Sequence, residues 1–237
     1  MYFSHTHYLP VALPFFALFA FALALLILLL QIRVLRYAYM RLGVSPGAAM
    51  ALLLGSLIGG AINIPVAELP ASPMAPSGLV PYYGRLYVVP EATGAPGVIL
   101  AVNVGGAVIP TLLSFYLMSR RRIFGAGVVA TAFMAILCHA LARPVAGVGV
   151  ALPTFAPPLA AALIAALVSW RDLAPLAYIG GSLGVLIGAD LMNLDKLRGL
   201  GAPVASIGGA GTFDGIFVTG LLAVLLASIA RGGEAQN

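Results

Sequence analysis

Long apolar runs that contain almost no charge dominate this 237-residue sequence. The clearest run, 15–30, has no charged residue at all. A helix needs about 20 mostly apolar residues to cross the ~30 Å hydrocarbon core of a bilayer. Charged residues make up 8% of this chain, against ~25% in soluble domains, so they are too few to cover a soluble globule. The sequence therefore predicts an integral membrane protein and excludes a soluble domain, a disordered chain and a coiled coil.

Seven apolar runs predict membrane-spanning helices, because helices satisfy their own backbone hydrogen bonds inside the bilayer. Together they predict an all-α polytopic bundle that forms a single integral membrane domain over 1–237. The fifth run is short and prolines crowd its start, so it either crosses the bilayer or re-enters on the same side. The predicted spans are about 11–32, 48–66, 97–119, 123–142, 154–170, 175–194 and 206–230.

The distribution of lysine and arginine predicts the orientation, because cytoplasmic loops carry an excess of both. Eight of the 12 basic residues follow the first, third, fifth or seventh run, and four lie on the other side. We therefore predict an external N-terminus and a cytoplasmic C-terminus in the cytoplasmic membrane of a prokaryote. If the fifth run does not cross, everything after it is reversed. The eight residues are Arg33, Arg36, Arg41, Arg120, Arg121, Arg122, Arg171 and Arg231.

The longest polar stretch, 67–96, follows the second run and is predicted to be an external loop. Its six prolines prevent a long helix. Three tyrosines around Gly84, within 79–89, predict a short β-hairpin. This loop would serve as a lid, as a surface for a partner, or as an ordered connector.

Two aspartates lie inside apolar runs, Asp190 near the end of the sixth and Asp214 at the start of the seventh. An aspartate at the centre of a membrane helix costs ~2.5–3.5 kcal/mol even on lenient scales, so each needs an explanation. Antiparallel neighbouring helices would bring both carboxyls within about one helical turn, ~5 Å, in depth. Gly180, Gly184 and Gly188 form a stripe of small residues on the sixth helix, and Asp190 lies off this stripe. The stripe predicts close packing of the sixth helix against one neighbour, while Asp190 faces another.

Two carboxyls in one site of low dielectric constant cannot both ionise and share a proton. Such a pair can activate water for peptide hydrolysis, as in aspartic proteases, or bind a proton or cation during transport. Each aspartate could instead only hydrogen-bond a helix end. We predict Asp190 and Asp214 as a catalytic pair that acts on a membrane-embedded peptide. The alternatives are a proton- or cation-coupled transporter or channel, and a non-enzymatic scaffold whose external loop binds a partner.

Further polar side chains fall near the same predicted external ends of their helices: Asn63, Asn103, His139 and Arg143. A solvent-filled cavity would explain them, and so would the ordinary polarity of helix ends. We predict Asn63, Asn103 and His139 as substrate-binding residues, although His139 alone is also typical of a structural histidine. In the transporter alternative the two asparagines would coordinate the ion.

No motif predicts a cofactor. His5 and His7 are spaced like a metal-binding pair but have no third ligand nearby, so no metal site is predicted. The basic residues form short clusters rather than a stripe, which excludes a nucleic-acid partner. The arginines at 120–122 are expected to anchor the chain on anionic lipid. The expected partners are the lipid bilayer and a membrane-embedded peptide, and the oligomeric state is left open.

Five motifs resemble a family of uncharacterised prokaryotic polytopic membrane proteins that is defined as a domain of unknown function. The resemblance covers roughly 45–225 and implies a polytopic membrane fold without implying an activity. The motifs are Asn63-Ile-Pro65, Ala101-Val-Asn-Val-Gly-Gly-Ala-Val-Ile-Pro110, Arg143-Pro-Val-Ala-Gly-Val-Gly149, Gly188-Ala-Asp-Leu191 and Gly209-Ala-Gly-Thr-Phe-Asp-Gly-Ile-Phe217.

The two aspartates also resemble, more distantly, those of the presenilin-type intramembrane aspartyl proteases, which include signal peptide peptidases. That group places one catalytic aspartate on each of two adjacent helices, the second within Gly-x-Gly-Asp. The resemblance implies these roles for Asp190 and Asp214. The sequence departs from the pattern, because Thr212 and Phe213 follow Gly211 before Asp214 and the residue directly before Asp190 is not a tyrosine. That group also has a Pro-Ala-Leu element after its aspartates, whereas the two Ala-Leu-Pro segments of this chain, at 12–14 and 151–153, both come before Asp190 and Asp214.

Overall fold

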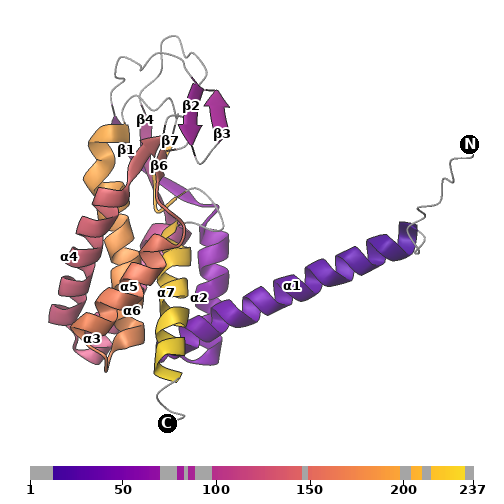
Figure 1. Cartoon of the computed structure of the whole chain (residues 1–237), viewed down its shortest axis with the longest axis horizontal. Helices are drawn as coiled ribbons and strands as arrows, with labels where there is room; N and C mark the ends of the chain where they lie inside the picture. The colour runs from indigo at the N-terminus through magenta and orange to yellow at the C-terminus, as the bar shows by residue number, and fades with distance from the viewer. Residues whose placement is uncertain are drawn as a thin grey trace, which may run out of the picture.

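The computed structural model of this chain describes residues 13–69, 79–82, 85–88, 98–145, 149–197, 204–209 and 215–232. Its helices form a bundle with a small β-sheet at one end, and the first helix extends away from the bundle at the other end (Figure 1). The described α-helices are α1 (Leu13–Arg41), α2 (Pro46–Gly59), α3 (Ile109–Arg121), α4 (Phe124–Leu141), α5 (Ala156–Val168), α6 (Leu173–Val185) and α7 (Gly215–Gly232).

Two π-helical turns interrupt the regular helices. The turn η1 (Val104–Val108) leads into α3, and the turn η2 (Leu186–Asp190) continues α6. A 3-10 helix, η3 (Leu191–Leu197), follows η2.

Within the described residues, two helices are long and apolar enough to cross a membrane: Phe124–Leu141 and Leu173–Lys196. A third crossing is added if Ala24–Arg41 and Pro46–Gly59, which are bent 119° apart, count as one broken span. Ala156–Val168 and Gly215–Ala230 are apolar but shorter. These helices indicate a membrane protein, but the predicted count of seven spans is not confirmed.

The described chain is mostly helical, as predicted, but three of the predicted spans contain short strands that the sequence did not indicate. Each strand is short and largely apolar and contains two or three β-branched residues, and hydrophobic periodicity does not distinguish such a segment from part of a buried helix. In the first strand Pro65 also biases Ile64 toward an extended backbone. The strands are β1 (Asn63–Leu69), β4 (Val98–Asn103) and β7 (Val204–Ile207). β4 lies inside the predicted span 97–119, whereas β1 overlaps the end of 48–66 and β7 overlaps the start of 206–230.

These three strands form one sheet in the order β1-β4-β7. The central strand β4 is antiparallel to β1 and parallel to β7, and Asn63 lies directly opposite Asn103. The predicted hairpin within 79–89 is confirmed, because β2 (Leu79–Tyr82) pairs antiparallel with β3 (Arg85–Val88). A further small hairpin joins β5 (Arg143–Val145) to β6 (Gly149–Ala151).

Helix α6 is buried along its whole length, and α4, α5 and α7 pack around it. The predicted glycine stripe does face a single neighbour. Gly180 lies against Ala130 of α4, and Gly188 lies against Ala135 of the same helix. The absence of side chains on the stripe lets the two backbones approach closely.

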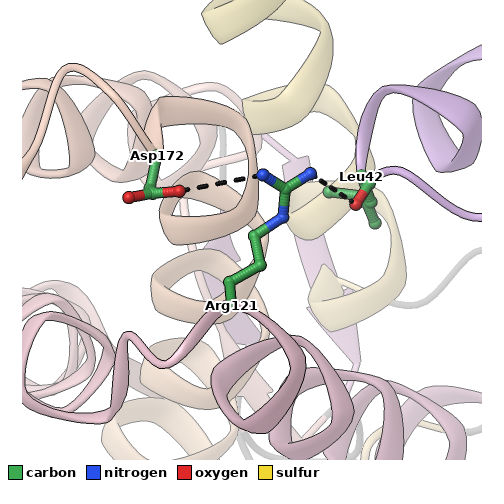
Figure 2. A network of polar contacts seen from close by, with 3 residues as sticks. All are labelled: Leu42, Arg121 and Asp172. Atoms are coloured by element: carbon green, nitrogen blue, oxygen red, sulfur yellow. Dashed lines mark hydrogen bonds and ion pairs between the residues drawn. The ribbon is translucent and has the colours of Figure 1, made fainter.

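The end of the bundle opposite the sheet is basic. Arg121 donates a hydrogen bond from Nη2 to the Leu42 carbonyl oxygen at 3.2 Å, and its Nη1 lies 3.8 Å from Asp172 Oδ1 (Figure 2). Arg41 Nε donates to Ser228 Oγ at 3.1 Å. These contacts join the ends of α1, α3 and α7 to the start of α6. They agree with the predicted grouping of Arg41 and Arg121 on one side, whereas the assignment of that side to the cytoplasm stays a prediction.

Candidate functional site

The candidate site lies where the end of α6 meets the sheet. Asp190 is the last residue of η2, and its Oδ2 accepts a hydrogen bond from the Gly208 amide at 2.7 Å. Gly208 follows β7 and has φ of +88°, a conformation that strongly favours glycine. A single side-chain carboxyl therefore ties a predominantly apolar helix to the turn at the end of β7.

The Gly208 turn also contacts the other π-helical turn. A Cβ atom on Gly208 would lie 2.6 Å from the Ala107 amide nitrogen and 2.9 Å from the Gly106 carbonyl carbon, both in η1. The two π-helical turns thus meet at one glycine. π-helical turns are rare, and those that occur are often found at functional sites. This junction of two such turns is therefore the most distinctive place in the described structure.

The two predicted asparagines are brought together beside this junction. Asn103 is fully buried and donates from Nδ2 to the Gly60 carbonyl oxygen at 2.8 Å and to Asn63 Oδ1 at 3.1 Å. Its own Oδ1 accepts from the Gly106 amide at 2.8 Å, which caps the start of η1. The Asn103 amide therefore holds main chain together, whereas Asn63 is exposed.

Ser206 of β7 links these asparagines to the Gly208 turn, and the sequence reasoning missed it. Its Oγ lies 2.6 Å from Asn63 Oδ1 and 2.6 Å from the Gly209 carbonyl oxygen. A hydroxyl carries one hydrogen, so these two acceptors compete for it. No motif marks Ser206 in the sequence, because its contacts arise from the pairing of β7 with β4, in which it lies beside Ala101.

His139 lies on α4, one helical turn after Ala135. It is partly buried, and its Nδ1 has no hydrogen-bond partner among the residues that the structure describes. No hydrogen bond within those residues links it to the asparagines or to Asp190. The structure therefore does not join His139 to the other predicted site residues through polar contacts.

Asp214 lies outside the described residues, and so do His5 and His7. The predicted proximity of Asp190 and Asp214 accordingly stays a prediction. Within the described ranges, no basic side chain forms an ion pair with Asp190. The nearest lysine in sequence, Lys196, instead donates from Nζ to Asn193 Oδ1 at 2.7 Å.

Asn193 holds the end of the same helix. Its Nδ2 donates to the carbonyl oxygens of Gly188 and Ala189 at 2.9 and 3.0 Å, and the side chain is fully buried. Regular helices leave their last carbonyl groups without intrahelical partners. The amide of Asn193 supplies such partners inside the π-helical turn, and it thereby supports the backbone that carries Asp190.

Replacing Asn103 by alanine is expected to lower the free energy of unfolding by about 2–4 kcal/mol, because it leaves the buried Gly60 carbonyl and Gly106 amide without this partner. Thermal unfolding of the purified chain in detergent measures the loss. The matched control is Asn63→Ala, which removes an exposed member of the same pair and is expected to cost less than about 1 kcal/mol. Equal losses in the two variants would contradict the role assigned to Asn103.

Comparison with known proteins adds a family but no activity. The family model described as "Protein of unknown function (DUF1614)" matches residues 57–226, which contain β1, β4, β7 and Asp190. No curated protein and no solved structure matches the chain. The match agrees with the resemblance to a domain of unknown function, and the comparisons add no support for the presenilin-type resemblance.

Proposed function

The chain belongs to the DUF1614 family of proteins of unknown function, and from its own geometry we propose that it is an intramembrane aspartyl hydrolase. Its substrate is a membrane-embedded peptide, cleaved beside Asp190. The protein lies in the cytoplasmic membrane of a prokaryote, with its N-terminus outside and the arginine-rich end of the bundle in the cytoplasm.

One observation supports this proposal above the others: an aspartate from an apolar helix is hydrogen-bonded to the end of an edge strand. β7 pairs with β4 on one side and is the last strand of the sheet. A peptide can be cut only when its backbone is extended enough to expose the scissile carbonyl. Inside a bilayer, unwinding leaves backbone groups without partners, and each such group costs several kcal/mol. A strand edge offers those partners, because extended peptides add to sheet edges through main-chain hydrogen bonds.

The chemistry needs two carboxyl groups. One takes a proton from the attacking water, and the other, protonated, donates a hydrogen bond to the scissile carbonyl. Asp190 supplies one group and Asp214 the other in this proposal. Asp214 immediately precedes Gly215, where α7 begins, and α7 packs on α6 so closely that Gly181 lies beside Gly220. This packing supports the pairing of the two aspartates across the last two helices.

A second candidate function is proton- or cation-coupled transport. It is favoured by the convergence of Ser206 Oγ, Asn63 Oδ1 and the Gly209 carbonyl oxygen near an aspartate with no basic partner in the described ranges. Oxygen atoms of this kind are the ligands that hard cations prefer. Intramembrane aspartates also serve as proton relays in transporters.

The deciding experiment incubates the purified full-length protein, in detergent and in liposomes, with synthetic transmembrane peptides. One set carries a central Gly-Pro segment that unwinds, and the matched set carries polyleucine. Cleavage inside the unwinding peptides, located by mass spectrometry and absent from the polyleucine set, is the expected result. If a folded preparation cleaves no peptide of a broad panel but dissipates an imposed proton or cation gradient in liposomes, transport replaces hydrolysis.

A further inference from the structure

A groove that Asp190 does not line runs between α2 and α3 and begins at the basic end of the bundle. Its volume is about 1010 Å³. Along α3 it extends from Arg120 to Ile109, a separation of 11 residues or about 16 Å. Apolar side chains form most of its walls, and Leu112 and Tyr116 on its rim are 64% and 50% exposed. The groove is therefore an elongated apolar slot that is open to the surroundings of the bundle.

Positive charge is concentrated at one end of this groove. Arg120 is the one charged residue among those that line it. The first turn of α2, capped by Ser45, lies at the same end, and a helix N-terminus carries a partial positive charge. Pro46 carries no amide hydrogen and the Ala48 amide donates to Ser45 Oγ at 3.3 Å, so the Gly47 amide is the group of this turn that suits a phosphate oxygen.

The neighbouring arginines have other roles, so the charge in the groove comes from Arg120. Arg121 is held by the Leu42 carbonyl and by Asp172 (Figure 2). Arg122 takes the left-handed backbone conformation that ends α3, with φ of 56°, and is not part of the groove wall. The three consecutive arginines therefore have different positions: Arg120 lines the groove, Arg121 contacts Leu42 and Asp172, and Arg122 ends α3.

We propose that the groove between α2 and α3 is a binding site for one anionic phospholipid. The phosphate lies between the Arg120 guanidinium and the first turn of α2, and an acyl chain lies along Leu52 and Leu112. Tyr116, one helical turn from Arg120, faces the region between headgroup and chain, where tyrosine is enriched in membrane proteins. This inference does not depend on the proposed hydrolase activity, because it uses neither Asp190 nor the sheet.

The test is native mass spectrometry of the full-length protein in a non-ionic detergent, titrated with phosphatidylglycerol or with phosphatidylcholine of the same acyl chains. Phosphatidylglycerol is expected to be retained preferentially. Arg120→Gln removes a charge-assisted contact, so retention of phosphatidylglycerol is expected to fall about tenfold. Ala48→Phe, an exposed position in the groove wall, is expected to lower retention of both lipids by filling the slot.

Arg122→Gln is the matched control, since it removes the same charge two residues away and outside the groove. The proposal is overturned if this control lowers retention as much as Arg120→Gln, which would indicate a general basic anchor. It is also overturned if both lipids are retained equally, or if Ala48→Phe has no effect. Inorganic phosphate at millimolar concentration is included, and displacement of phosphatidylglycerol by phosphate alone would mean that the site binds a free anion and not a lipid.

Discussion

Replacing Asp190 by asparagine is expected to lower peptide cleavage by about 10²–10⁴-fold, the contribution typical of a general acid or base. The side chain keeps its shape, and the asparagine oxygen can still accept the hydrogen bond that Gly208 donates to Asp190 at 2.7 Å. What the variant loses is the ability to take up or release a proton. The substitution therefore separates the structural role of this side chain from its chemical role.

The measurement compares initial cleavage rates of one unwinding transmembrane peptide by the wild type, Asp190→Asn and a control. Asp195→Asn is the matched control, because Asp195 is an exposed aspartate in η3 only five residues away. The control is expected to cleave at the wild-type rate. If Asp190→Asn unfolds at the same temperature as the wild type and cleaves the peptide at the wild-type rate, the Asp190 carboxyl only caps the Gly208 turn.

Replacing Gly105 by alanine is expected to lower the free energy of unfolding by about 3 kcal/mol or more. A Cβ atom at this position of η1 would overlap the Ser56 carbonyl oxygen and the Gly60 amide nitrogen, both main-chain atoms of the segment that ends α2. Gly59 faces the same contact, since a Cβ atom there would lie 2.9 Å from the Gly105 amide. Backbone atoms cannot rotate away as a side chain does, so one element must shift.

Thermal unfolding in detergent, followed by circular dichroism, measures this effect. The matched control is Gly47→Ala in the first turn of α2, where an added Cβ meets no atom within 4 Å. Alanine favours helix over glycine by up to about 1 kcal/mol, so the control is expected to be as stable as the wild type or slightly more stable. Equal stability of Gly105→Ala and wild type would contradict the close approach of α2 and η1.

Some features of the fold could be predicted because they depend on local patterns. The apolar runs at 123–142 and 175–194 correspond to helices that are long enough to cross a membrane. The stripe of Gly180, Gly184 and Gly188 predicted close packing on one neighbour, and these glycines do lie against α4. In both cases the information is carried by residues within one helix, where spacing alone determines which side chains share a face.

The strands and the candidate site could be predicted only in part. Asn63 and Asn103 were expected in one site, and they do meet, although the spacing did not show that strand pairing joins them. Ser206 was missed because it contacts Asn63 across 143 positions of the chain. Strand register is a property of two segments together, so no single segment encodes it.

By itself, the sequence determined that this chain is stable in a membrane rather than in water. The free energy of transferring a side chain from water is a property of that side chain, so 62% hydrophobic residues in long runs are enough to indicate a membrane. Only the tertiary structure decided which polar atoms inside those runs meet. The contact of Asp190 with Gly208 depends on where β7 pairs with β4, and that pairing is a competition between distant segments for the same hydrogen-bonding groups.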